Sequence, residues 1–243
     1  MDVDNLYILK QFFLDLFFPA FCINCNKEGS YLSQDCRAVL DICYLQYCLC
    51  NRNPKILPFG GKCERCKDKN LSGLYFALPY KENQITRKLI HSFKYQPYLK
   101  DLAKTLASIL IEHFVISNKN TNDIWENSVL IPIPLDKKKI RIRGYNQSEE
   151  LAKELSKILN VPMVKDNLIK TRSTKPQMEL SGKERGENLK DAFVIKNPAE
   201  LAGKKIFLID DVYTTGSTME ECAEVIKNSG VKNVWGVVIA REN

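Results

Sequence analysis

The chain has 243 residues, of which 44% are hydrophobic and 27% are charged, and it carries a net charge of +7. This length accommodates one full domain and a smaller segment, and a domain of this size buries a core without disulfide bonds. The acidic start of the sequence predicts no secretory signal, so we expect a cytoplasmic protein. The apolar run from Phe12 to Ile23 contains Asp15 and Pro19 and is too short to span a bilayer, so it predicts a short amphipathic helix and no transmembrane segment.

Cysteine is concentrated early in the chain. Eight of the nine cysteines lie between Cys22 and Cys66, which favours metal binding over disulfides in a chain without an export signal. Two pairs, Cys22–Cys25 and Cys63–Cys66, have the C-x-x-C spacing with which two thiolates bind one tetrahedral Zn²⁺. A redox role is the alternative, but neither pair stands at a strand-to-helix junction. The predicted ligands of one or two structural zinc sites are Cys22, Cys25, Cys36, Cys43, Cys48, Cys50, Cys63 and Cys66.

Strand and helix signals alternate after a turn-rich segment that ends near residue 73. They predict a strand at 74–79, helices at 84–93 and 101–114, a strand at 128–135, a helix at 147–159, a strand at 205–209, a helix at 219–228 and a strand at 234–240. Short apolar strands alternating with helices are typical of an α/β fold whose parallel sheet is covered on both faces. We therefore predict a cysteine-rich module over residues 1–72 and an α/β domain over residues 73–243. Cys222, on the helix at 219–228, is expected to be a buried structural thiol.

The clearest site signal is the string from Phe207 to Thr218, FLIDDVYTTGST, where a predicted strand runs into a helix. Ligands of open parallel sheets bind at the carboxyl ends of the strands. Gly216 would let the backbone approach an anion, and nearby N–H groups and hydroxyls would surround a phosphate. These hydroxyls belong to Thr214, Thr215, Ser217 and Thr218. The carboxylates of Asp210 and Asp211 suit sugar hydroxyls or a metal, whereas a Walker loop would need a lysine. A capped turn without a ligand is the alternative.

Positive charge gathers between residues 131 and 190, where 14 Lys and Arg stand against 8 Asp and Glu. The densest run contains Lys137, Lys138, Lys139, Arg141 and Arg143, and it is followed by Tyr145, Asn146 and Gln147. A second basic segment, residues 170–185, includes Lys175, Gln177 and Arg185 and predicts a mobile loop that leads into a helix. Such charge attracts a pyrophosphate or a nucleic-acid backbone, although a solvated lysine-rich surface is the alternative.

These motifs occur in an order that resembles the ComF (ComFC) family. The cysteine segment is followed by Leu89-Ile-His-Ser-Phe-Lys-Tyr95, a proline-rich strand end at Leu130–Leu135, Arg143-Gly-Tyr-Asn-Gln147 and the Asp-Asp string. The last of these resembles the phosphoribosyl-pyrophosphate (PRPP) motif of type I phosphoribosyltransferases. The resemblance implies a type I phosphoribosyltransferase-like parallel sheet flanked by helices, with a small zinc-ribbon-like N-terminal module.

The resemblance also implies roles for the site residues. Asp210 and Asp211 would hold the ribose 2′ and 3′ hydroxyls, and residues 214–218 would bind the 5′-phosphate. Pro132, Ile133 and Pro134 would form the pyrophosphate loop. The family pattern has four C-x-x-C pairs, but Ser33 stands where the partner of Cys36 would be and Cys48-Leu-Cys50 is contracted. The first zinc site would then depend on Cys43.

Two functions follow from these expectations. The first is a competence protein that binds PRPP and single-stranded DNA during DNA uptake, together with other uptake proteins, with Tyr95, Tyr98 or Tyr145 stacking on bases. The second is an active phosphoribosyltransferase that moves phosphoribose to an unidentified base or amine, with Mg²⁺ on the pyrophosphate. No residue of the sequence is an evident general base for this transfer.

Overall fold

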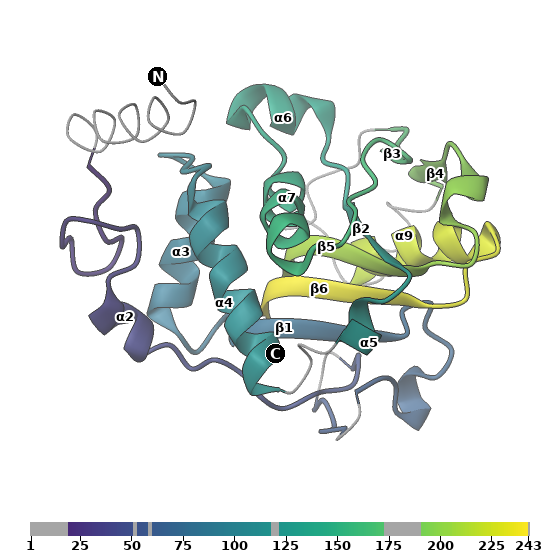
Figure 1. The fold of residues 1–243 in the computed structure, drawn as a ribbon, viewed down its shortest axis with the longest axis horizontal. Helices are drawn as coiled ribbons and strands as arrows, with labels where there is room; N and C mark the ends of the chain where they lie inside the picture. The colour runs from purple at the N-terminus through teal and green to yellow at the C-terminus, as the bar shows by residue number, and fades with distance from the viewer. Residues whose placement is uncertain (1–18, 51–52, 58–59, 118–121, 173–190, 243) are drawn as a thin grey trace.

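Four apolar strands form the centre of the molecule in the computed structural model, which describes residues 19–50, 53–57, 60–117, 122–172 and 191–242 (Figure 1). The strands are β1 (Gly73–Pro79), β2 (Ser128–Pro132), β5 (Lys205–Tyr213) and β6 (Val234–Arg241). They lie in the order β1-β6-β5-β2, and all three neighbouring pairs are parallel. The predicted parallel α/β sheet is confirmed.

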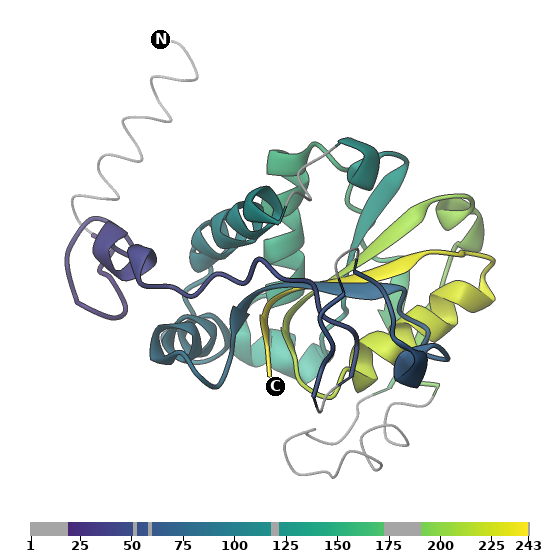
Figure 2. The ribbon, with the colours of Figure 1, turned by 90° about the horizontal axis from the view of Figure 1, so that it is seen from below.

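Helices cover both faces of this sheet (Figure 2). The first core contains the buried residues of α3 (Gln84–Lys94), α4 (Leu102–Ile116) and α7 (Gln147–Leu159), and the second contains those of α9 (Ser217–Asn228). Successive side chains of a strand point to opposite faces, so β5 contributes Phe207 to the first core and Leu208 to the second. Among the described residues, none of the helices is both long enough and apolar enough to cross a membrane.

Several short elements were not predicted from the sequence. They are α2 (Gln34–Ala38), η1 (Glu64–Cys66), α5 (Asn122–Trp125), α6 (Lys137–Arg143), β3 (Leu168–Lys170), β4 (Phe193–Ile195) and η3 (Pro198–Leu201). Strand β2 stops at Pro132, short of the predicted Leu135, because the prolines of this segment cannot donate to a ladder. Strand β5 continues past Ile209 to Tyr213, because its last residues still pair with β6.

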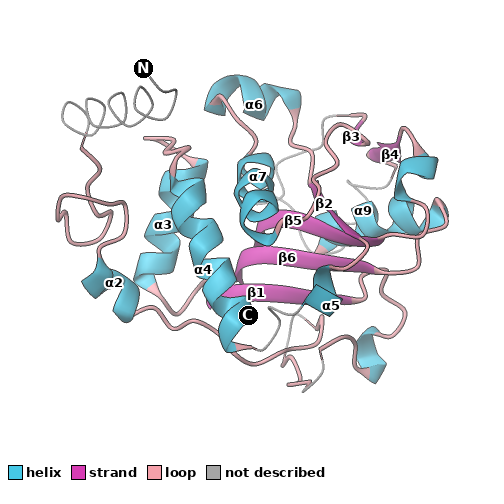
Figure 3. Cartoon of the chain, in the orientation of Figure 1, coloured by secondary structure: helices cyan, strands magenta, loops and turns pink. Residues whose placement is uncertain are grey.

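The cysteine-rich segment contributes to both cores and is not detached from the sheet. Cys22 and Cys36 belong to the first core, whereas Cys48, Cys63 and Cys66 belong to the second. Between these two groups the chain passes along strand β1, the outer strand of the sheet (Figure 3). Residues before and after the domain boundary predicted at residue 73 therefore pack into the same two cores. That boundary stays a prediction.

The helix predicted from Phe12 to Ile23 lies largely outside the described residues. Its described end is not helical, because Phe21 forms an isolated antiparallel bridge with Glu28. The chain then turns back toward the first cysteines, so the predicted helix does not extend to Ile23.

A substitution of Gly73, at the start of β1, would test how tightly the sheet is packed. A Cβ atom at this position would lie 2.7 Å from Cε3 of Trp235, whose ring stacks on Tyr75 at a centroid distance of 5.2 Å. We expect Gly73→Ala to destabilise the protein by about 1–3 kcal/mol, since the added carbon overpacks a filled space. Urea unfolding measures this change. Combining Gly73→Ala with Trp235→Leu should cost less than the sum of the two single changes, and strict additivity would contradict the proposed overlap.

Candidate functional site

The carboxyl ends of β2 and β5 bring two predicted site segments together. Pro132 pairs with Ile209, and the Ile133 amide donates to the Ile209 carbonyl oxygen at 3.0 Å. The side-chain amide of Asn146 donates to the Ile133 carbonyl oxygen at 3.0 Å, which fixes the chain after β2. The Pro132–Pro134 segment therefore lies directly beside the strand that carries Asp210 and Asp211.

The loop between β5 and α9, the predicted anion cradle, turns tightly into the helix at Gly216. Gly216 is the N-cap of α9 with φ 78°, and a Cβ atom there would lie 2.6 Å from Cε2 of Tyr213, so both the conformation and the space require glycine. The hydroxyls of Thr215 and Ser217 lie 2.9 Å apart at the start of the helix. The first N–H groups of a twelve-residue helix and these hydroxyls can surround a phosphate.

The acidic pair consists of the partly buried Asp210 and the buried Asp211, and both have defined partners. Asp210 Oδ1 accepts hydrogen bonds from Ser148 Oγ and from the Asp211 amide, both at 2.9 Å. Asp211 Oδ1 lies 2.8 Å from Nζ of Lys94. Burial and the charge of Asp211 raise the pKa of Asp210 to about 7. The charge of Lys94 and the hydrogen bond from Ser148 act in the opposite direction and lower the pKa of Asp210.

Sequence reasoning assigned no role to Lys94 or Ser148. Both stand in or beside strings that carried the family resemblance, and Ser148 is the second residue of α7, after the Asn146 cap and Gln147. A lysine at the end of a helix is usually a surface residue, so its sequence position contained no signal that it reaches a buried carboxylate.

A basic and aromatic surface lies on α3 and α6. Lys137, Lys138, Lys139 and Arg141 of α6 are exposed, as the sequence predicted for a polyanion-binding run. The guanidinium carbon of Arg143 lies 5.8 Å from the centre of the Tyr95 ring, and this ring lies 5.0 Å from that of His91. Tyr95 is 43% exposed, so its ring is available to a ligand.

Three residues predicted to contact a nucleic acid or pyrophosphate have other roles. Tyr145 is 7% exposed, and its hydroxyl donates to the Phe93 carbonyl oxygen at 2.6 Å, so its ring is not a stacking platform. Asn146 caps α7, and Gln147 is buried in its first turn. The remaining predicted contacts, Lys175, Gln177 and Arg185, lie outside the described residues.

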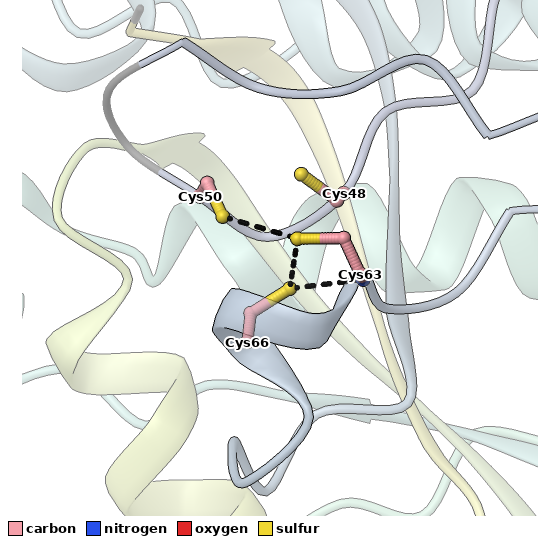
Figure 4. A group of neighbouring side chains, drawn as sticks. All are labelled: Cys48, Cys50, Cys63 and Cys66. Atoms are coloured by element: carbon pink, nitrogen blue, oxygen red, sulfur yellow. Dashed lines mark hydrogen bonds between the residues drawn. The ribbon is translucent and has the colours of Figure 1, made fainter.

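One cysteine group has the composition of a tetrahedral metal site (Figure 4). The sulfur atoms of Cys48, Cys50, Cys63 and Cys66 all lie within 4.8 Å of one another. Cys63 Sγ lies 3.5 Å from Cys50 Sγ and 3.5 Å from Cys66 Sγ, and no disulfide joins them. Four thiolates at this spacing suit Zn²⁺.

Arg241 indicates that this group carries negative charge. The residue is fully buried and donates from Nη1 to the Cys48 carbonyl oxygen at 2.9 Å and from Nη2 to that of Cys50. Its Nε has no hydrogen-bond partner, and no carboxylate of the described residues forms an ion pair with it. A buried guanidinium needs a counter-charge, and four thiolates around one divalent ion would supply it. The residues present therefore fit a bound metal.

The other cysteine group has only three sulfur ligands. Cys22, Cys25 and Cys36 lie within 4.8 Å of one another, and Ser33 Oγ lies 3.3 Å from Cys25 Sγ. The first zinc site would depend on Cys43, but the structure does not bring Cys43 to this group. Its backbone amide donates to the Ala77 carbonyl oxygen of β1, which holds Cys43 outside both groups.

The geometry agrees with what comparison with known proteins shows. Residues 145–243 match a family model described as a phosphoribosyl transferase domain. Competence protein F from Haemophilus influenzae is 36% identical over 157 residues, which cover 63% of this chain and 67% of that protein. The DNA utilization protein YhgH from Escherichia coli (strain K12) is 32% identical over 149 residues, which cover 60% of this chain and 64% of that protein.

A third relative, competence protein ComFC from Bacillus subtilis, is 35% identical over 105 residues, which cover 42% of this chain and 39% of that protein. The matches thus span about two thirds of the first relative and less of the others. They confirm the resemblance that the order of motifs indicated. The chain belongs to the competence protein F (ComF) family, and its parallel sheet forms a phosphoribosyl transferase domain.

Proposed function

We propose that this protein binds PRPP at the carboxyl ends of β2 and β5 and single-stranded DNA at the surface of α3 and α6, and that it acts in DNA uptake on the cytoplasmic side. The observation that carries the PRPP proposal is the meeting of the acidic pair, the Gly216 loop and the Pro132–Pro134 segment at one edge of the sheet. The phosphoribosyl transferase match over residues 145–243 supports it.

Each part of this edge suits one part of PRPP. The ribose hydroxyls would donate to the carboxylates of Asp210 and Asp211, and the 5′-phosphate would lie in the loop of residues 214–218. The pyrophosphate would lie beside Pro132–Pro134. Mg²⁺ would neutralise part of the pyrophosphate charge.

The second candidate function is phosphoribosyl transfer itself. An acceptor nitrogen would bond to C1 of the ribose, and the bond from C1 to the pyrophosphate oxygen would break with the electrons leaving on pyrophosphate. The phosphoribosyl transferase match favours this chemistry, because Asp210, Asp211 and the loop of residues 214–218 lie within the matched residues.

The single-stranded DNA proposal rests on the exposed Tyr95 between His91 and Arg143 and on the neighbouring cations of α6. An aromatic ring among cations combines base stacking with phosphate contacts. The names of the relatives, competence and DNA utilization proteins, support a role with DNA.

Replacing Asp210 and Asp211 together by Ala should weaken PRPP binding by about 100-fold or more, because two hydrogen bonds to charged acceptors are lost. Calorimetry with Mg²⁺ and PRPP measures the change in PRPP affinity. Pyrophosphate release with candidate bases tests turnover in the same variants. Asp68→Ala, at an exposed site, is the matched control. Unchanged PRPP affinity in the double variant would exclude this edge as the binding site.

Neutralising Lys137, Lys138, Lys139 and Arg141 to Gln should weaken single-stranded DNA binding and flatten its salt dependence, since fewer counterions are released. Tyr95→Ala should weaken binding by about 1–3 kcal/mol, with little change in the salt slope. Fluorescence anisotropy across a salt series measures both effects. Ile142→Ala, a neutral change on the same helix, is the control. The surface is wrongly assigned if all these variants bind DNA like wild type.

We expect about one tightly held Zn²⁺ per chain, bound by the four-cysteine group, because the other group lacks a fourth thiolate. Cys48→Ser should lose this ion and lower the melting temperature, since metal binding contributes to folding. Ser33→Cys should raise the tightly held content to about two per chain. Elemental analysis after dialysis against a chelator measures this, with Cys222→Ser as the control. Metal-free wild-type protein would refute the zinc assignment.

A further inference from the structure

Helix α3 ends next to the acidic pair. Lys94 is its last residue, and the side chains of Lys94 and Asp211, 24% and 8% exposed, form an ion pair of 2.8 Å. The end of the helix is held in place by the hydroxyl of Tyr145, which donates to the carbonyl oxygen of the fully buried Phe93. The ammonium group is therefore placed by the fold before any ligand arrives.

In each carboxylate of the pair, one of the two oxygens contacts the partners described above. Asp210 Oδ1 accepts from Ser148 and from the Asp211 amide, and Asp211 Oδ1 contacts Lys94. Within the described part of the chain, Oδ2 of either carboxylate has no hydrogen-bond partner. The arrangement leaves one oxygen of each residue for a donor such as a ribose hydroxyl.

Lys94 is also the cation that balances the pair. Two other titratable groups face these residues: the thiol of Cys222, whose pKa burial raises well above its usual range, and the phenol of Tyr95. Neither a thiol nor a phenol is a cation, so neither can balance the carboxylates. Burial lowers the pKa of Lys94, but the charges of Asp211 and Asp210 and the hydrogen bond to Asp211 outweigh this and raise it. Without Lys94, the two neighbouring carboxylates would face each other and a polyanionic ligand without compensation.

We propose that Lys94 is a positioning residue of the ribose site, which holds one oxygen of the Asp211 carboxylate and turns the second toward a ribose hydroxyl. The inference rests on the proposed binding of PRPP. In this proposal Lys94 affects ligand binding by orienting Asp211. It does not contact the phosphates of the ligand itself.

A double-mutant cycle tests whether Lys94 acts on the ligand through Asp211. Lys94→Met should weaken binding of Mg²⁺ and PRPP by about 10-fold or more, and Lys94→Arg should restore part of the affinity because it keeps the charge. The effect of Lys94→Met should disappear when Asp211 is already Asn, since the residue through which Lys94 acts is gone. Lys104→Met, which removes an exposed lysine of α4, is the control for net charge.

The pH dependence separates this role from a merely structural one. The charge of Lys94 lowers the pKa of Asp210, so its loss should raise that pKa, and a protonated carboxyl accepts a hydrogen bond from a hydroxyl less well. The affinity of Lys94→Met for PRPP should therefore fall more steeply than that of wild type as the pH is lowered from about 8.5 to about 6.5. Circular dichroism checks that each variant is folded, and Lys94→Arg carries the test if Lys94→Met unfolds.

The outcomes distinguish the two proposals. Wild-type protein without measurable PRPP binding overturns the proposed function, and the assignment of Lys94 falls with it. PRPP binding in wild type that is equally strong in Lys94→Met overturns only the inference. Additive losses in the cycle also overturn it, because Lys94 would then contact the ligand independently of Asp211.

Discussion

Strand β5 ends near two adjacent carboxylates, the partly buried Asp210 and the buried Asp211, and both need partners where they lie. Ser148 at the start of α7 donates a hydrogen bond to Asp210, and Lys94 at the end of α3 forms an ion pair with Asp211. A buried cation lies on the neighbouring strand β6, where Arg241 donates to the carbonyl oxygens of Cys48 and Cys50 of the four-cysteine group. Buried charges of either sign are stable only with such partners, so each one dictates the sequence around it.

The cysteine segment contacts the residue that precedes the loop of residues 214–218, to which we assign phosphate binding. Tyr213 directly precedes the loop, its hydroxyl donates to the Leu49 carbonyl oxygen at 3.4 Å, and its ring fills the space that a side chain at residue 216 would need. The Asn70 amide donates to Glu220 of α9 at 2.7 Å. The four-cysteine group and the anion cradle therefore belong to one packed region, although they are far apart in the sequence.

Periodic apolar patterns were sufficient to predict the sheet and the long helices, because each of these elements buries a face. The predicted bounds of α7, residues 147–159, agree with the structure, since Asn146 caps it and Leu151 and Leu155 are buried. Helix α6 has no buried residue and only seven positions, so no pattern marked it. Lys94, the burial of Tyr145 and the position of Cys43 depend on contacts between segments distant in the chain, which one sequence does not contain.

The path of the chain between the two cysteine groups also protects the sheet. Strand β1 lies at one edge, and the Cys43 amide bonds to Ala77 along it, while at the other edge Leu130 of β2 forms a bridge with Met163. An uncovered edge strand offers unpaired backbone groups to other chains and promotes aggregation. A cysteine group lies at each end of the covering segment. A metal held by the four-cysteine group would help to keep this segment on β1, so these thiols would shield the sheet edge from other chains as well as stabilise the fold.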